Sequence, residues 1–172
     1  MREKEIEPFA WLSQKTSHRW RRNVYVSATS QTGRGVFANK AFHMGDRVLV
    51  FEGPKKQRDE FISADELAHA LQIDIDIYLG PSGGEDDFVN HSCDPNTYLK
   101  GRQTLVANRS IAPDEEITVD YASVTEELNW QMKCQCGARN CRGLIRSFSE
   151  TPEHIRQQPH FQTWLAKSLF RN

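Results

Sequence analysis

The sequence predicts a mainly β fold with short helices. Apolar and polar residues alternate in several short segments, which is the pattern of half-buried strands. Apolar runs reach only four residues, as in Val48 to Phe51, and no long segment has the period of a helix. Clusters of glycine, proline, serine and aspartate separate the segments and indicate turns.

Most of the expected elements are strands. The first, NVYVSA, is followed by the turn residues of QTGRGVFA, which lead into the second. A third strand, RVLVFE, ends at Gly53-Pro54. We expect strands over 23–28, 33–38, 47–52, 73–79, near 98–99, near 105–107 and over 117–121.

Two helical segments are expected. Ser63 to Glu66 reads as a capping box, which starts a short helix that runs to about Leu71. Thr151 and Pro152 suit the N-cap and the first turn of a C-terminal helix. Pro159 interrupts this helix, which then continues over 160–170. Its apolar residues either pack on the body of the protein or form a dimer face.

Length and composition fit one domain with a fair core. The chain has 172 residues, of which 38% are hydrophobic, and four tryptophans, which argues against global disorder. The first residues, MREKEIEPFAW, are charged and show no secretory signal. We therefore expect an intracellular protein, cytoplasmic or nuclear, that does not span a membrane.

Charge is distributed unevenly along the chain. Residues 59–127 contain 16 acidic and three basic side chains, a balance of −13, and the remainder contains seven acidic and 19 basic ones, a balance of +12. One interpretation is mutual neutralisation in the folded protein. The other is an acidic surface that attracts a lysine-containing basic protein or peptide. Direct binding of nucleic acid is not expected, because the acidic segment repels phosphates.

The cysteines predict a single metal site. Cys134, Cys136 and Cys141 lie within eight residues, and Cys93 lies far upstream. A disulfide between Cys134 and Cys136 would strain the backbone. Four thiolates suit one structural Zn²⁺ in tetrahedral coordination, and ordinary thiols are the alternative. A metal bond to Cys93 would bring residues 134–146 back onto the middle of the protein.

Four motifs in order resemble the SET-domain protein-lysine methyltransferases with a zinc-binding post-SET tail. They are GRGVFA (33–38), DDFVNHSCDPN (86–96), EEITVDY (115–121) and CQCGARNCRG (134–143). The resemblance implies a SET-domain (β-clip) fold of small curved sheets with a pseudoknot, plus a zinc-bound post-SET segment. It divides the chain into an N-terminal flank (1–22), a SET domain (23–123), a post-SET zinc segment (124–147) and a C-terminal helical extension (148–172).

The resemblance also implies a reaction, the transfer of a methyl group from S-adenosylmethionine to the side-chain amine of a lysine. Residues implied in binding this donor are Gly33, Arg34, Gly35, Asn90, His91, Tyr121 and Leu144. Glycines allow close approach of the backbone, and Arg34 is expected to turn its side chain to solvent. Asn90 contributes its amide and His91 its backbone, although an Asx turn and a core imidazole are the structural alternatives.

Tyr121 is the expected catalytic residue, with Tyr78 as a second aromatic of an apolar lysine channel. A phenol with a pKa of about 10 is a poor base at neutral pH, so Tyr121 would align the reactants. For both tyrosines, a structural strand position is the alternative. Val119 occupies a position where many family members have an aromatic residue, which leaves more space around the amine.

Two other classes of function remain open at this point. One is a catalytically silent, zinc-stapled SET-like module that binds basic peptides. The other is a zinc-bearing nucleic-acid binder, which the acidic middle segment disfavours. The sequence leaves the oligomeric state open.

Overall fold

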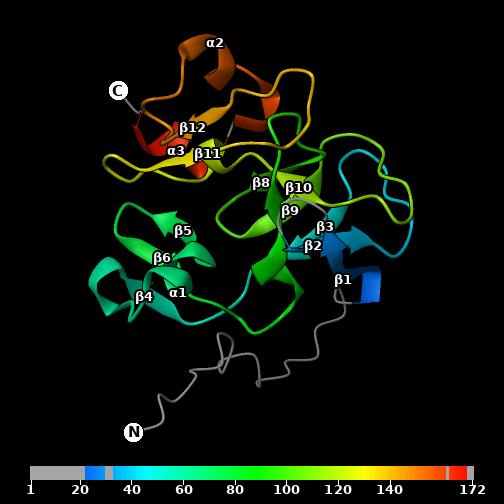
Figure 1. Ribbon diagram of the computed structural model, residues 1–172, viewed down its shortest axis with the longest axis horizontal. Helices are drawn as coiled ribbons and strands as arrows, with labels where there is room; N and C mark the ends of the chain where they lie inside the picture. The colour runs from blue at the N-terminus through cyan, green and yellow to red at the C-terminus, as the bar shows by residue number, and fades with distance from the viewer. Residues whose placement is uncertain (1–21, 30–32, 162, 170–172) are drawn as a thin grey trace, which may run out of the picture.

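Strands dominate the computed structural model, which describes residues 22–29, 33–161 and 163–169 (Figure 1). Except for Arg22, the expected N-terminal flank lies outside the described residues. The strands are β1 (Val24–Thr29), β2 (Gly33–Ala38), β3 (Arg47–Val50), β4 (Lys55–Gln57), β5 (Leu71–Asp74), β6 (Ile77–Leu79), β7 (Asn90–His91), β8 (Thr97–Lys100), β9 (Thr104–Ala107), β10 (Thr118–Val119), β11 (Gln131–Lys133) and β12 (Leu144–Arg146). The α-helices are α1 (Ala64–Ala68), α2 (Glu153–Arg156) and α3 (Trp164–Leu169), and the 3₁₀ helices are η2 (Arg58–Glu60), η3 (Glu85–Phe88), η4 (Tyr121–Ser123) and η5 (Pro159–Phe161).

Within the described ranges these strands form five small sheets. Their orders are β1-β2, β10-β7, β11-β12, β3-β9-β8 and β4-β6-β5. The β7–β10 pair is parallel and joins Asn90 to Thr118 and His91 to Val119. This pairing places the NHS segment, Asn90 to Ser92, beside the segment that leads into Tyr121.

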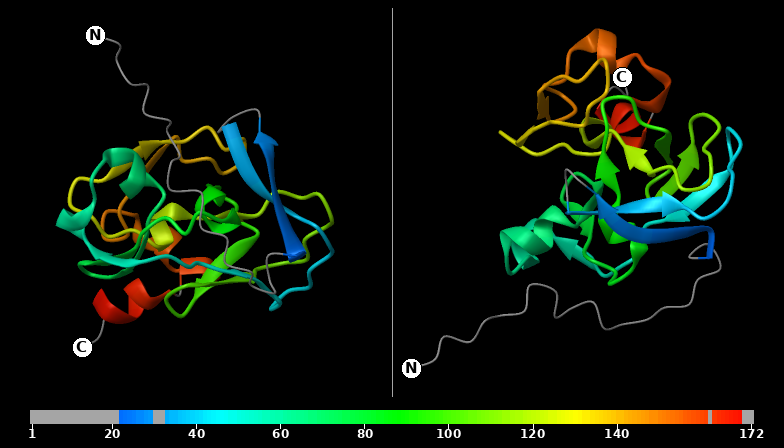
Figure 2. Two further views of the ribbon diagram at one scale, coloured as in Figure 1. Left: turned by 90° about the horizontal axis from the view of Figure 1, so that it is seen from below. Right: turned by 45° about the vertical axis from the view of Figure 1, so that its right-hand side comes forward.

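The sheets surround a common core. Figure 1 shows β11, β12, α2 and α3 together at one end, β4, β5, β6 and α1 along one side, and β1–β2 on the other; Figure 2 gives two further views. The most deeply buried large side chains come from β3, β8, β9, β12, η5, α3 and the segments that connect such elements: Phe42, Phe148, Phe161, Leu49, Leu99, Leu105, Ile111, Ile117, Ile145 and Leu165. The predicted fold class is therefore confirmed.

The C-terminal segment packs on the body, in agreement with the first of the two expectations for it. Phe161, Trp164 and Leu165 are buried in the common core, and Phe170 lies outside the described residues. Thr151 is not an N-cap, because the cap position of α2 belongs to Pro152. The Thr151 hydroxyl donates instead to the Ser147 carbonyl oxygen at 3.0 Å.

The expected strand over 73–79 was wrong, because the chain turns in its middle. Ile75 N–H donates to the carboxylate of Asp74 at 3.0 Å, and β5 and β6 pair antiparallel on either side of the turn. The alternation of apolar and acidic residues continued through this turn because Ile75 is itself an exposed turn residue. The preceding helix ends at Ala68 rather than Leu71, although Ser63 caps it as expected by accepting from Glu66 N–H at 3.0 Å.

The expected strand over 117–121 is shorter than predicted. Only Thr118 and Val119 pair, and Tyr121 begins η4. The reason is Asp120, whose carboxylate accepts a hydrogen bond from Ala122 N–H at 3.1 Å and caps the 3₁₀ turn. This strand is not the last one, because β11 and β12 follow.

Candidate active site and metal centre

The glycine motif and Asn90 meet although they are more than 50 residues apart. The Asn90 side-chain amide donates to the Arg34 carbonyl oxygen at 2.8 Å and to Glu116 Oε1 at 2.7 Å. A Cβ at position 35 would lie 2.8 Å from Asn90 Nδ2, so glycine is required by the close approach. Gly33 has a φ of 82°, a backbone conformation that favours glycine. Four of the residues expected to bind the donor are therefore neighbours.

Arg34 itself turns away from this contact. Its side chain is exposed, and the guanidinium carbon lies 4.2 Å above the ring centre of Phe88. Only its backbone therefore faces Asn90.

The side chain of His91 connects the backbone of Tyr121 to the sulfur of Cys93. Its Nδ1 accepts a hydrogen bond from Tyr121 N–H at 3.1 Å, so Nδ1 carries no proton. Its Nε2 then carries the proton of the neutral ring and lies 3.4 Å from Cys93 Sγ. Burial lowers the pKa of His91 to about 4, which keeps this ring neutral. The imidazole is thus fully engaged inside the protein.

Tyr121 is held through both its backbone and its hydroxyl. The hydroxyl donates to the Val89 carbonyl oxygen at 2.8 Å, and the ring centre lies 5.4 Å from that of His91. Burial and the nearby charge of Glu116 raise the pKa of Tyr121 to about 12. The phenol is therefore neutral and fixed in direction at physiological pH.

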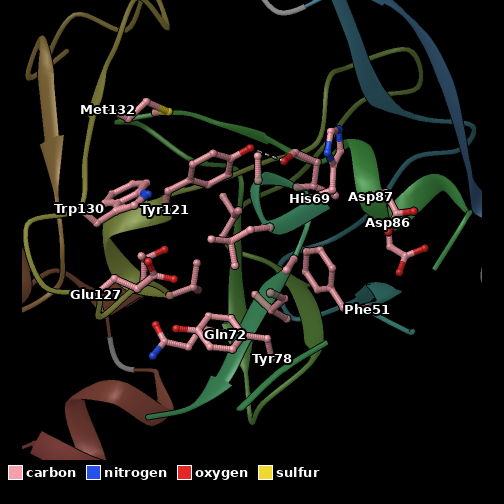
Figure 3. A pocket seen from close by; sticks show the side chains of 18 of the residues that line it. Phe51, His69, Gln72, Tyr78, Asp86, Asp87, Tyr121, Glu127, Trp130 and Met132 are labelled. Atoms are coloured by element: carbon pink, nitrogen blue, oxygen red, sulfur yellow. Dashed lines mark hydrogen bonds between the residues drawn. The ribbon is translucent and has the colours of Figure 1, made fainter. Parts of the chain in front are cut away.

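Both predicted catalytic tyrosines line one pocket of about 360 Å³. Figure 3 shows Tyr121 and Tyr78 on opposite sides of it. Val119 also lines the pocket. Both tyrosines expected at the lysine channel therefore line the same cavity, and its use by a lysine stays a prediction.

The pocket is not wholly apolar, which corrects the expectation for the lysine channel. Glu127 lines it together with Tyr78. Burial and the nearby charge of Glu127 raise the pKa of Tyr78. Asp86 and Asp87 also line the pocket, but their carboxylates accept hydrogen bonds from backbone N–H groups, those of Glu52, Ser82 and Gly83. Glu127 is the third carboxylate of the lining, and its Oε2 lies 3.5 Å from Arg58 Nε.

Several residues of this pocket were not predicted. They include Phe51, His69, Gln72, Glu127, Trp130 and Met132. The sequence held a signal for the last three of these. If Cys134 returns to Cys93, the residues just before Cys134 have to lie near the site. Phe51, His69 and Gln72 carry no such signal.

The four cysteines converge as predicted. Cys93 Sγ lies 3.8 Å from Cys134 Sγ, and Cys141 Sγ lies 3.7 Å from Cys134 Sγ. Tetrahedral zinc with Zn–S bonds of about 2.3 Å requires sulfur–sulfur distances of about 3.8 Å. One donor atom from each of His91, Cys93, Cys134 and Cys136 also lies within 4.8 Å of the others. This group has His91 in place of the predicted Cys141, so Cys93, Cys134 and Cys136 with a fourth donor, from His91 or Cys141, fit one zinc ion.

Backbone N–H groups surround these sulfurs. Arg142 N–H donates to Cys93 Sγ, Cys93 N–H to Cys136 Sγ and Cys136 N–H to Cys134 Sγ, each at 3.4 Å. Such hydrogen bonds offset the negative charge of metal-bound thiolates. Burial raises the pKa of Cys93 and Cys134, which disfavours bare thiolates at these two positions.

The tail, residues 134–144, contacts the NHS segment and the Tyr121 turn through polar groups as well as through its cysteine sulfurs. Asn140 Nδ2 donates to the Cys93 carbonyl oxygen at 3.0 Å. The guanidinium of Arg142 pairs with Asp120 at 2.6 Å. Leu144 follows on β12, where it pairs with Lys133 and stays 39% exposed. Its contact with a donor remains a prediction.

Comparison with known proteins places the chain in a family. Residues 33–122, more than half of the chain, match the SET domain, so the chain belongs to the SET-domain family. It is 26% identical over 144 residues to histone-lysine N-methyltransferase trr of Drosophila melanogaster and 30% identical over 138 residues to human histone-lysine N-methyltransferase 2B. The alignments cover 74% and 71% of this chain but only 6% and 5% of those relatives.

Solved structures agree with this assignment. A crystal structure of KRYPTONITE in complex with mCHG DNA and SAH is 25% identical, with a TM-score of 0.59, and the match covers 72% of this chain and 29% of that one. A second KRYPTONITE complex, with mCHH DNA, H3(1-15) peptide and SAH, is 26% identical with a TM-score of 0.56 and covers the same shares. In the described part of this chain, no helix is long and apolar enough to cross a membrane.

Proposed function

We propose that this chain transfers a methyl group from S-adenosylmethionine to the side-chain amine of a lysine in a basic protein. The observation that carries the proposal is the pocket with Tyr121 and Tyr78 at its wall, next to the contact between Asn90 and the glycine motif. Relatives named as histone-lysine methyltransferases support the reaction, and SAH in two solved relatives supports the donor.

The donor site is assigned to Gly33, Arg34, Gly35, Asn90, His91, Tyr121 and Leu144. The Asn90 amide and the backbone groups of this set can form hydrogen bonds with the carboxylate, the amino group and the adenine of the donor. When bound, S-adenosylmethionine supplies an electrophilic methyl carbon. Its binding site and the lysine pocket then meet at Tyr121.

The lysine must reach this point as a neutral amine. Deprotonation at pH 7 costs about 4.6 kcal/mol from a reference pKa of about 10.4. Burial among Val119, Tyr121 and Trp130 disfavours the ammonium and lowers that cost. The amine nitrogen forms a bond to the methyl carbon, the carbon–sulfur bond breaks, and the second proton leaves to water. Tyr121 orients the reactants through its fixed phenol.

Glu127 and the acidic middle segment support a basic partner. The Glu127 side chain is 19% exposed, lines the pocket and also lies 3.5 Å from Arg58. It is thus placed to meet a cationic side chain of the substrate. Histones are the first substrates to test, because the relatives are named for them.

One structural Zn²⁺ is assigned to Cys93, Cys134, Cys136 and Cys141, with His91 donating to Cys93. The ion would hold the tail beside Asn90, which lies three residues before Cys93.

The test is transfer of labelled methyl groups to histones, followed by mass spectrometry of the modified residue. We expect label on lysine with the wild type and little with Tyr121→Phe. If calorimetry shows that the donor binds but neither protein transfers label, the result would support a silent peptide-binding module and contradict the proposal.

A further inference from the structure

The C-terminal segment contacts both ends of the turn that carries Tyr121. The Thr163 hydroxyl donates to the carbonyl oxygen of Ser123, the last residue of η4, at 2.7 Å. His160 Nε2 lies 3.6 Å from Oδ2 of Asp120, the N-cap residue of η4. All four residues are at least 94% buried.

We propose that His160 and Thr163 are positioning residues that fix the η4 turn and thereby the direction of the Tyr121 phenol. The proposal rests on the proposed methyl transfer, in which Tyr121 aligns the reactants. Neither residue belongs to the SET match, which ends at residue 122. The C-terminal extension is therefore a working part of the site.

The two oxygens of the Asp120 carboxylate have different partners. Oδ1 accepts from the Arg142 guanidinium at 2.6 Å and from Ala122 N–H at 3.1 Å. Oδ2 faces His160 Nε2, and neither of these two atoms has a full hydrogen bond within the described residues. A shift of a few tenths of an ångström completes one. Without the imidazole, a buried carboxylate oxygen would have no partner, which is costly.

The position of Asp120 makes its orientation matter for Tyr121. The carboxylate caps the turn, and the backbone N–H of Tyr121 donates to His91. A rotation of the cap therefore moves the N–H of Tyr121, its ring and its hydroxyl together. Because the phenol has to lie where donor and amine meet, a small shift is sufficient to slow transfer.

Isosteric variants test the two contacts separately. His160→Phe keeps a buried ring but removes the donor to Asp120, and Thr163→Val keeps the shape but removes the donor to Ser123. We expect each to lower kcat roughly 10-fold, with donor affinity and zinc content unchanged. His160→Gln retains an N–H donor and is expected to restore most of kcat.

A loss of stability has to be separated from a loss of positioning. Ile111→Ala serves as the control, because it removes a buried side chain at the bridge to Phe42, with which the backbone of Ile111 exchanges two hydrogen bonds. All variants are compared well below their melting temperatures. The control is expected to melt earlier but to keep the wild-type kcat.

A spectroscopic measurement makes the test independent of activity. Fluorotyrosine labels four positions, and Tyr121→Phe assigns the signal of Tyr121. We expect this ¹⁹F signal to shift or broaden in His160→Phe and Thr163→Val, but not in Ile111→Ala, while the Tyr25 signal stays constant. Wild-type kcat and an unchanged Tyr121 signal in both variants would overturn the proposal. If the wild type transfers no methyl group but the Tyr121 signal still changes in the two variants, the positioning is upheld and the proposed reaction is rejected.

Discussion

Two regions of the molecule border the pocket, and they are held in opposite ways. The junction, residues 90–93, 118–123 and 134–144, joins distant segments through buried polar contacts such as Asp120–Arg142, whose side chains are 1% and 15% exposed. The pocket wall, residues 55–79, consists of local hairpins and a short helix. Its internal pair Lys56–Glu66 is 23% and 13% exposed, and the pair that Asp74 forms with Arg102, outside this range, is more exposed, at 40% and 49%. Rigid buried contacts suit the alignment of reactants, and an exposed wall suits contact with a variable partner.

Breaking the junction at its proposed zinc site is expected to have the largest effect. Chelation, or Cys93→Ser, removes the link between tail and NHS segment, so donor binding should be abolished and Tm should fall by roughly 10 °C or more. Calorimetry, melting curves and metal analysis measure this, and zinc added after chelation should restore binding. Normal donor binding by metal-free protein would show that the tail is not part of the donor site.

Within the junction, Tyr121→Phe tests the reacting end of the pocket. We expect kcat to fall by roughly 10²-fold, because the phenol proposed to orient the reactants is lost. Tyr25→Phe is the matched control; it removes an exposed hydroxyl that donates to Asp114 at 2.8 Å. Equal rates for both variants would remove Tyr121 from the mechanism.

The next prediction concerns the pocket wall and the loop that faces it. Glu127→Gln should raise KM for a basic peptide about 5-fold with little change in kcat, because one negative charge is lost at the pocket. The increase should shrink in high salt. Asp114→Asn removes the same charge outside the pocket and tolerates the positive φ of 65° at that position. If KM rises equally in both variants, overall charge and not Glu127 attracts the substrate.

The smallest expected effect is on alkaline stability. Burial raises the pKa of Tyr121 from 10.0 to about 12, so the folded state holds this proton more tightly than the unfolded state. The resulting stability is complete below pH 10 and is lost as the pH rises to about 12. Urea unfolding between pH 9 and pH 11 should show a shallower decline for Tyr121→Phe than for the wild type. Parallel declines would contradict a raised pKa.

The sequence predicted the junction better than the pocket wall. The motifs indicated that Asn90 and Gly35 share one site and that Cys93 joins the other three cysteines. They could do so because metal binding and close backbone approach restrict which residue types these positions accept. In the wall, the capping box at Ser63 predicted the start of α1, but the strands had only alternation to guide them, and alternation continued through the turn at Ile75. The end of the last predicted strand was missed because Asp120 caps the turn that follows it. Asp120 is held there by Arg142, and residue spacing does not show that these two side chains meet.

The return of the tail also affects how the protein is made. Domains begin to fold from the N-terminal side during synthesis. Here the glycine motif is translated near residue 33, its partner Asn90 follows, and Cys141 and Thr163, which contact Cys134 and Ser123, come last. A nascent chain released from the ribosome before Thr163 would contain every matched motif and still lack the contact that completes the Tyr121 turn.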